Sequence, residues 1–181
     1  MDKFEEALES LQALRGAAAQ VKCPHLRNLN RIVLSDPRFV TAPGGSAHHH
    51  DYEHGLVIHV YEVMQNVFSM TNYHPSDELI TAVIWHDYMK VQDYKWLDGK
   101  IVKTEYGKLI YHVAGSAMAF HHEASGMLSV EVLERIEHML LSHHGRKEWG
   151  SPVEPATAEA LILHTADMMS SKGKNVIIEA R

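Results

Sequence analysis

Histidine and aspartate residues recur along this chain in an order that a two-metal site needs. Neutral imidazole binds transition metals and carboxylate suits harder ions, so a mixed set favours Mn, Fe, Co, Ni or Zn. Successive members lie about 24 to 31 residues apart, roughly one helix and a connection, so ligands on neighbouring helices would converge on one point. In chain order, the set is His59, His86-Asp87, His112, His143-His144 and Asp167. This spacing predicts a metal site.

The amino-acid composition is also rich in metal-binding side chains. The chain has 15 histidines against 17 lysines and arginines together, which hydrophobic packing alone does not require. Sulfur adds little, since Cys23 is the single cysteine. The triplet His48-His49-His50 lies inside the chain, between Gly44-Gly45 and an apolar-periodic segment, where an expression tag is not expected.

Length and composition predict one domain, residues 1–181, with a sizeable core. Of 181 residues, 45% are hydrophobic and 22% are charged. The net charge of −6, without a lysine- and arginine-rich block, argues against long nucleic acid as the main partner and favours a small phosphorylated molecule. The N-terminus has no signal-peptide pattern and no apolar run approaches about 18 residues, so we expect a cytoplasmic protein that does not bind membranes.

The apolar pattern predicts an all-α fold, a helical bundle with a small β-hairpin insertion. Residues 1–24 have helical spacing and should form an N-terminal packing helix, whereas residues 35–50 have turn chemistry and should form a loop. Asp98-Gly99, within an aromatic and β-branched stretch, predicts a hairpin at about 93–103. Further helices are predicted from Gly55 to about Met70, from an N-cap at Ser76 to His86-Asp87, from Tyr111 to Ala124, from Ser129 to Ser142 and from Pro155 to roughly Ser171.

Several of these residues carry a resemblance to a known family. The order of His59, His86-Asp87 and Asp167 matches the H…HD…D pattern of the HD-domain metal-dependent phosphohydrolase superfamily. The histidine-rich stretch before His59 is most similar to the branch that includes the YhaM-like 3′-to-5′ exoribonucleases and the HD domains of certain conjugative relaxases. The resemblance starts at about residue 45 and includes residues 86–90, similar to the family's HDxGK, and residues 141–145. His54 and Met89 stand where the family usually has glycine.

The resemblance implies an HD domain with a metal-binding core over residues 45–171 and two divalent transition metal ions. Asp87 would bridge the two ions, because a carboxylate has two oxygens, and a metal-bound hydroxide would be the nucleophile. Lys90 would act beside Asp87 in catalysis and hold phosphate as a point charge, and Arg146 would add a bidentate phosphate contact. The implied ligands are His59, His86, Asp87 and Asp167 for the first ion, and Asp87, His112 and His143 for the second.

Other interpretations of these residues stay open. Many HD proteins use a single ion, in which case His112 or His143 could bind phosphate. His144 could be a ligand or a substrate contact. The loop histidines have two interpretations. They could contact substrate or protonate a leaving group, or they could simply belong to a solvated histidine-rich loop; the residues are His49, His50 and His54. Base stacking competes with packing for Tyr52, Trp85, Tyr88 and Trp96. His121-His122-Glu123 is expected at the surface, and the methionines, including Met139, Met168 and Met169, in the core.

The leading functional hypothesis is hydrolysis of a phosphate ester in a nucleotide or short oligonucleotide. The ligand set fits a deoxynucleoside triphosphate hydrolase, a nucleoside monophosphate phosphatase, or a phosphodiesterase acting on a cyclic nucleotide or short RNA. Alternatives are a 3′-5′ exonuclease acting on nucleic acid ends and a non-catalytic regulatory module that binds metal and nucleotide. A helical interaction domain with incidental histidines would bind no metal tightly, and a homo-oligomer is compatible with all of these.

Overall fold

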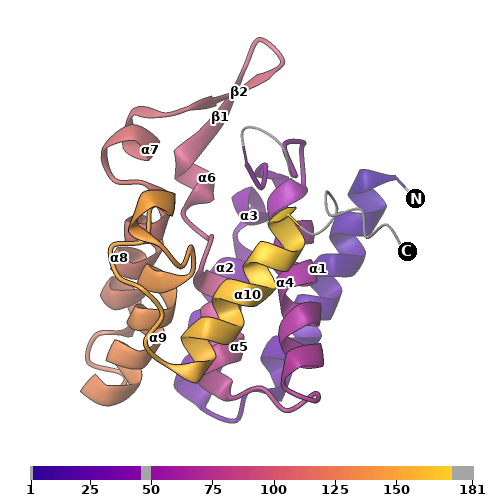
Figure 1. Ribbon diagram of the computed structural model, residues 1–181. Coiled ribbons are helices and arrows are strands. Elements are labelled where there is room, and N and C mark those ends of the chain that lie inside the picture. Colours follow the sequence, from indigo (N-terminus) through magenta and orange to yellow (C-terminus); the bar gives the residue numbers. More distant parts are fainter. Residues whose placement is uncertain (1, 46–49, 173–181) are drawn as a thin grey trace, which may run out of the picture.

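A computed structural model describes residues 2–45 and 50–172, and within these ranges the fold is helical with one two-stranded antiparallel sheet (Figure 1). This confirms the predicted fold class. The elements are α1 (Lys3–Gln20), α2 (Pro24–Ser35), α3 (Pro37–Thr41), α4 (Gly55–Met70), α5 (Asp77–Trp85), α6 (Lys90–Asp93), β1 (Tyr94–Leu97), β2 (Lys100–Lys103), α7 (Glu105–Leu109), α8 (His112–Ala124), α9 (Val130–Ser142), the 3-10 helix η1 (Lys147–Trp149) and α10 (Ala158–Lys172).

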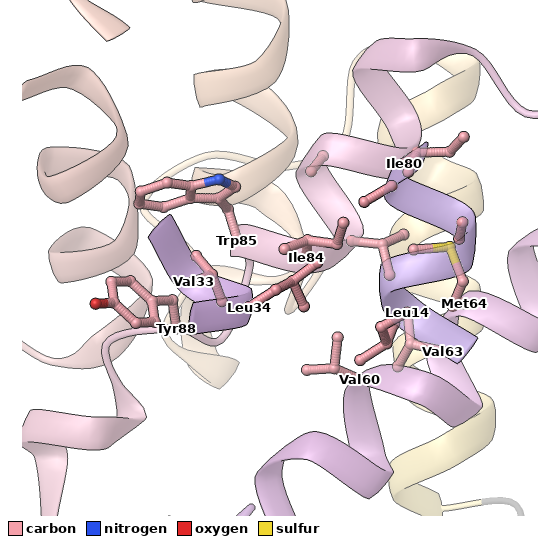
Figure 2. Packing of buried hydrophobic residues seen from close by; sticks show 14 of the residues in the cluster. Leu14, Val33, Leu34, Val60, Val63, Met64, Ile80, Ile84, Trp85 and Tyr88 are labelled. Atoms are coloured by element: carbon pink, nitrogen blue, oxygen red, sulfur yellow. The ribbon is translucent and has the colours of Figure 1, made fainter. Parts of the chain in front are cut away.

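Helix α4 lies at the centre of the core. It packs against α1, α3, α5 and α10, and accordingly most of its apolar residues are buried. In Figure 2, Val60, Val63 and Met64 of α4 face Leu14 of α1 and Ile84 of α5. Because α4 is held from several sides, a side chain on it has a fixed position relative to the neighbouring helices.

Helix α5 begins and ends as predicted. The Ser76 hydroxyl caps it by accepting a hydrogen bond from the backbone N–H of Leu79. At its other end Trp85 is fully buried and packs edge-on against Tyr88 and Phe120. Trp85 and Tyr88 are therefore packing residues, and the base-stacking role considered for them is wrong.

The predicted hairpin is formed by β1 and β2. Tyr94 pairs with Lys103 and Leu97 with Lys100, which leaves Asp98-Gly99 as a two-residue loop. Both loop residues have positive φ, 50° and 72°, as the turn that matches strand twist requires. The hairpin projects from the helical body in Figure 1.

Some sequence-based expectations were wrong. Residues 35–50 are not loop throughout, because Asp36 accepts a hydrogen bond from the Arg38 N–H and starts the short helix α3. The last helix begins at Ala158 rather than Pro155, since Thr157 caps it through the N–H of Ala160. Of the methionines, Met139 is buried as predicted, but Met169 is 50% exposed. Helices α2 and α7 had not been predicted.

Among the described residues, no helix combines the length and the apolar character that crossing a membrane requires.

Candidate metal centre

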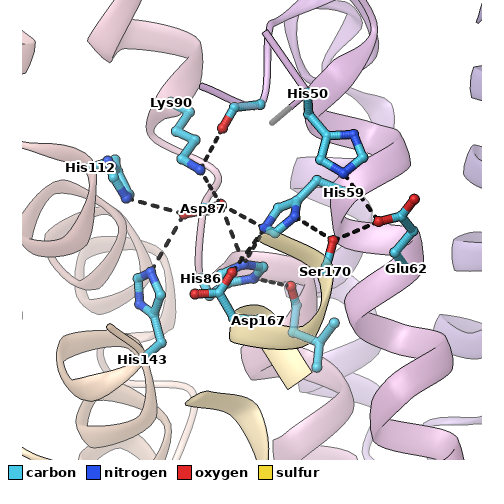
Figure 3. A network of polar contacts seen from close by, with 12 residues as sticks. His50, His59, Glu62, His86, Asp87, Lys90, His112, His143, Asp167 and Ser170 are labelled. Atoms are coloured by element: carbon cyan, nitrogen blue, oxygen red, sulfur yellow. Dashed lines mark hydrogen bonds and ion pairs between the residues drawn. The ribbon is translucent and has the colours of Figure 1, made fainter. Parts of the chain in front are cut away.

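The side chains of the predicted ligands lie together in one cluster, which is formed by helix ends and by two helices that run past it (Figure 3). His59 lies in the second turn of α4, and His86-Asp87 directly follow α5. His112 is the first residue of α8, His143-His144 directly follow α9, and Asp167 lies within α10. Segments from both halves of the chain therefore supply one cluster, as their spacing predicted.

Asp87 lies between two groups of imidazoles. Its side chain is 1% exposed, and Oδ2 lies 3.2 Å from Nε2 of His59 and 3.4 Å from Nε2 of His86. Its other oxygen, Oδ1, lies 3.2 Å from Nε2 of His112 and 3.5 Å from Nε2 of His143. Each carboxylate oxygen thus faces its own pair of nitrogens, as a carboxylate that bridges two ions would.

Two groups of donor atoms lie close enough to hold an ion each. In one group, the donor atoms of His59, His86 and Asp87 are all within 4.8 Å of one another, and Asp167 Oδ1 lies 3.2 Å from His59 Nε2. In the other group, Asp87, His112 and His143 are joined by His144, again within 4.8 Å. His144, which the sequence had left between ligand and substrate contact, is therefore positioned among the ligands.

Hydrogen bonds on the outer side of each ring orient the imidazoles. Backbone carbonyl and carboxylate oxygens only accept, so each Nδ1 that contacts one carries the proton and each Nε2 is directed toward the cluster. At His59 the acceptor is Ser170 Oγ, 2.9 Å away, whose own proton is donated to Glu62. The remaining Nδ1 contacts are His86 with Val83 O, His112 with Asp93 Oδ2, His143 with Leu140 O and His144 with Trp149 O, at 2.7 to 2.9 Å.

The cluster contains buried polar atoms that fit a cation. Among the described residues, Oδ1 of Asp87 and Nε2 of His143 make no hydrogen bond of acceptable geometry despite being buried. Unpaired buried acceptors are costly, and a metal ion between them would satisfy both. The donor set of imidazole nitrogen and carboxylate oxygen suits Mn, Fe, Co, Ni or Zn.

The electrostatics of the two groups differ. Burial lowers the pKa of His112 well below its ordinary value, and burial together with the neighbouring His143 ring lowers the pKa of His144 to about 4. Burial also opposes the imidazolium of His59, but hydrogen bonds with Asp167 and Asp87 outweigh it and raise the pKa to about 9. A positive charge at Nε2 of His59 is therefore stabilised by two carboxylates, whether a proton or a metal ion supplies it.

Lys90 contributes the positive charge next to Asp87. Its Nζ lies 2.6 Å from Asp87 Oδ2 and donates to the Gly44 carbonyl at 2.6 Å. Burial would lower the pKa of Lys90, but the Asp87 charge raises it. Burial likewise favours neutral Asp87, but Lys90 and nearby imidazoles hold its pKa well below the ordinary value. Lys90 is therefore charged, and it borders the open side of the cluster.

A cavity of about 360 Å³ opens over the cluster, within the usual range for small-molecule sites. Its lining includes His59, Lys90, His144 and Asp167 from the cluster, and, around them, Gly44, His50, Trp149, Met168, Ser171 and Lys172. A phosphate group of a small molecule could reach the ligands through this opening.

The other predicted contacts lie in different surroundings. His50 lines the cavity, with Nε2 3.1 Å from Glu62 and its ring 5.5 Å from that of His59. His54 is not in the lining; its ring lies against Phe4 and its Nδ1 bonds to Val40 O. Its φ of 73° lies in the left-handed region that glycine adopts without strain. Arg146 is exposed beside Trp149. His49 lies outside the described residues.

Three further residues belong to the site although the sequence had not singled them out. Asp93 accepts hydrogen bonds from the backbone N–H and Nδ1 of His112. Ser170 contacts His59, and Trp149 lines the cavity. Ser170 follows Asp167 by three residues, one helical turn, and this was the one signal in the sequence that could have found it.

Comparison with known proteins gives the family. The family model described as HD domain matches residues 56–171, so the chain belongs to the HD-domain family and the resemblance is confirmed. It is similar to the protein named 3′-5′ exoribonuclease YhaM from Geobacillus sp. (strain WCH70), at 33% identity over 94% of this chain and 52% of that protein. The proteins of the same name from Bacillus pumilus and Bacillus subtilis are 35% and 31% identical, each over 84% of this chain and 50% of the relative. The chain spans about half the length of these relatives. No solved structure matches.

Proposed function

We propose that this chain is a metal-dependent phosphohydrolase that cleaves a phosphate ester of a nucleotide or short oligonucleotide, with water as nucleophile. The observation that carries the proposal is the position of Asp87, with one carboxylate oxygen toward His59 and His86 and the other toward His112 and His143. A module that only binds its ligand has no chemical need for a carboxylate whose two oxygens face two separate groups of imidazoles below an open cavity.

The ligand assignment follows from the two groups. His59, His86, Asp87 and Asp167 would hold one divalent transition metal ion, and Asp87, His112, His143 and His144 would hold the other. Bound there, the ions would lower the pKa of a water molecule and offset charge on the phosphoryl oxygens.

The protein's own side chains would position the substrate. The Lys90 ammonium lies at the edge of the cluster, next to the cavity. It can exchange its ion pair with Asp87 for one with a phosphate oxygen of the substrate. Lys172 at the cavity and exposed Arg146 supply further positive charge for a polyanion. Burial of the ligands keeps bulk water from screening these interactions.

A second candidate is removal of nucleotides from the 3′ end of a nucleic acid. The YhaM relatives carry that activity in their name, and they extend to about twice the length aligned here. The same chemistry would serve both functions, since the ligands define the reaction type and not the leaving group. Substrate length therefore separates the two candidates. A regulatory module that binds metal and nucleotide without turnover is the remaining alternative.

The test is metal content, measured without a histidine tag, together with phosphate or nucleoside release from nucleotides and short oligonucleotides supplied with Mn²⁺. Two ions per chain with turnover supports the proposal, and preference among substrates separates the candidates. Asp87→Ala should abolish hydrolysis and most metal binding while the helical circular dichroism signal persists. If Asp87→Ala keeps its activity, the bridging role is wrong; metal without turnover in the unmodified protein supports the regulatory module.

Lys90→Ala tests the phosphate contact separately. We expect a higher KM or a lower kcat with metal content retained, because Lys90 is a neighbour of the ligands rather than one of them. Lys108→Ala is the matched control, since Lys108 is exposed on α7 and its ion pair is with Glu105. An unchanged kinetic profile for Lys90→Ala would remove this residue from substrate binding.

A further inference from the structure

The indole of Trp149 borders the cavity over the metal cluster. Trp149 ends η1, in the connection between α9 and α10, and its side chain is 41% exposed. Among the described residues that line the cavity, Trp149 is the one phenylalanine, tyrosine or tryptophan. Because this exposed ring lines the cavity, a ligand that fills the cavity would contact it.

The connection holds Trp149 in a fixed relation to the cluster. Its carbonyl accepts the hydrogen bond from Nδ1 of His144, at 2.8 Å. Gly145 has a φ of 82°, and a Cβ there would lie 2.3 Å from Cε1 of His164, so the backbone approaches that ring closely. The His164 ring in turn lies nearly parallel to the indole, with an interplanar angle of 29° and centroids 6.3 Å apart. The residues that orient His144 thus also orient the indole.

Two positive side chains lie over the ring. Nζ of Lys172 lies 4.5 Å from the indole centroid, and Cζ of Arg146 lies 5.0 Å from it. Both side chains are exposed, so they can move aside for a ligand at little cost. An aromatic platform with adjacent cations is the combination that binds single-stranded nucleic acid, because the ring stacks a base while the cations contact phosphate.

The other exposed or half-buried aromatics do not offer this arrangement. Trp96 is 46% exposed on β1 but does not line the cavity. Tyr52 is half-buried, its hydroxyl is bonded to His50, and it does not line the cavity. Trp149 is therefore the ring placed to meet a substrate whose phosphate lies at the cluster.

We propose that Trp149 stacks the nucleobase of the nucleotide unit whose phosphate lies at Asp87, and that Lys172 and Arg146 contact a neighbouring phosphate. This rests on the proposed function and specifies its substrate class as a nucleotide unit that carries its base, rather than a simple phosphate ester. Base stacking on an aromatic side chain contributes ~1–3 kcal/mol, which corresponds to roughly 5- to 150-fold in kcat/KM.

The experiment compares two short oligonucleotides that differ in the 3′-terminal unit, which carries adenine in one and is abasic in the other. Trp149→Ala should lower kcat/KM for the adenine substrate by roughly 5- to 150-fold, mainly through KM, and leave the abasic substrate unchanged. Trp149→Phe should recover part of the loss, because phenyl also stacks. Trp96→Ala is the matched control and should change neither. An equal loss on both substrates would show a structural role and overturn the proposal, as would no loss on either.

A binding measurement separates failure of this inference from failure of the proposed function. AMP should quench tryptophan fluorescence of the unmodified protein, and Trp149→Phe should lose that quenching although Trp85 and Trp96 remain. If neither these oligonucleotides nor any nucleotide of the panel is hydrolysed, the proposed function fails, and the AMP titration alone decides the stacking role. Quenching that persists in Trp149→Phe, or its absence in the unmodified protein, overturns the proposal.

Discussion

Single side chains behind the ligands decide how the cluster is oriented, and Asp93 is the clearest case. It is fully buried, and its Oδ2 accepts hydrogen bonds from both the backbone N–H and Nδ1 of His112, at 3.0 and 2.9 Å. Burial raises the pKa of Asp93 to about 6 although the His112 N–H opposes that shift. A carboxylate behind a ligand imidazole fixes its tautomer and increases its basicity.

Asp93→Asn should therefore weaken the ion held by His112 and spare the other. Loss of an outer partner of this kind costs about 10- to 100-fold in metal affinity. We expect one tight ion and one weakened ion per chain in a calorimetric Mn²⁺ titration. Asp98→Asn is the control, because Asp98 lies in the hairpin turn, where asparagine tolerates the same positive φ. Two unchanged binding events in Asp93→Asn would contradict the orienting role.

The convergence of the candidate ligands was predictable from the sequence, whereas the residues that support them were not. His59 and Asp87 belong to a set whose members are spaced by about one helix and a connection, and this spacing is visible along the chain. Asp93 and Trp149 have no such pattern, since each acquires its role only when its segment folds back onto His112 or His144. A hydrogen bond between segments depends on tertiary geometry that periodicity does not encode.

At the scale of elements, the segment before α4 connects the cavity to the core. The N–H of Gly44 donates to the His50 carbonyl at 2.8 Å, and that carbonyl lies against Gly55 at the start of α4. A Cβ on Gly55 would lie 2.0 Å from His50 O, so glycine is required for this approach. The same contact holds His50 beside His59 and the Gly44 carbonyl at Lys90.

Gly55→Ala should consequently destabilise the protein by about 1–3 kcal/mol, the range for overpacking against atoms that must shift. Gly16→Ala is a matched comparison, because Gly16 lies inside α1 with nothing within 4 Å of its Cβ position. That substitution should stabilise by about 0.5–1 kcal/mol through helix propensity. Urea unfolding measures both changes. Equal effects of the two substitutions would contradict the close approach at Gly55.

Helix α3 depends on Asp36, which gives a prediction for stability against pH. Asp36 accepts from the Arg38 N–H and side chain and from the Tyr88 hydroxyl. Burial would raise the pKa of Asp36, but these partners lower it below the model-compound value of 3.8. A carboxyl with a lowered folded-state pKa stabilises fully above its unfolded pKa, and this contribution is lost as the pH falls through the folded value.

Asp36→Ala should cost about 1–2 kcal/mol at neutral pH, as for other N-caps. Asp36→Asn keeps a capping acceptor but not the charge, so it should cost less. The difference between Asp36→Asn and the unmodified protein should shrink as the pH falls below about 4, where the carboxyl protonates. Urea unfolding between pH 3 and 7 measures the difference; a constant gap across this range would rule out a contribution from the Asp36 charge.

Element prediction succeeded where the signal was long or locally encoded. Helix α4 has a full apolar period over 16 residues, and the hairpin has Asp98-Gly99 at its turn. Helix α3 has five residues, too few for a period, and its start depends on the Asp36 side chain together with its contact to Tyr88. Helix α10 starts after Thr157 rather than at Pro155, because the Thr157 hydroxyl caps the helix by accepting a hydrogen bond from the Ala160 N–H.

For the whole molecule, metal binding and folding are expected to be coupled. The proposed ligands come from α4 and α10, which pack against each other, and from the ends of α5 and α9 and the start of α8. An unfolded chain would separate these groups, so an ion binds the folded state almost exclusively. Such binding stabilises by RT ln(1 + [ligand]/Kd), about 2.7 kcal/mol at 100 times Kd.

A thermal unfolding series should therefore show a higher Tm with Mn²⁺ than with excess chelator. For a chain of this size about 1 kcal/mol shifts Tm by roughly 2–4 °C, so at 100 times Kd we expect a rise of about 5–11 °C. Asp87→Asn should lose most of the rise, because it removes the charge shared by both groups. His121→Ala should keep it, since His121 is exposed and paired with Glu137. An equal rise in all three proteins would assign the stabilisation to metal bound elsewhere, because the ion would then not need the carboxylate that joins the helices.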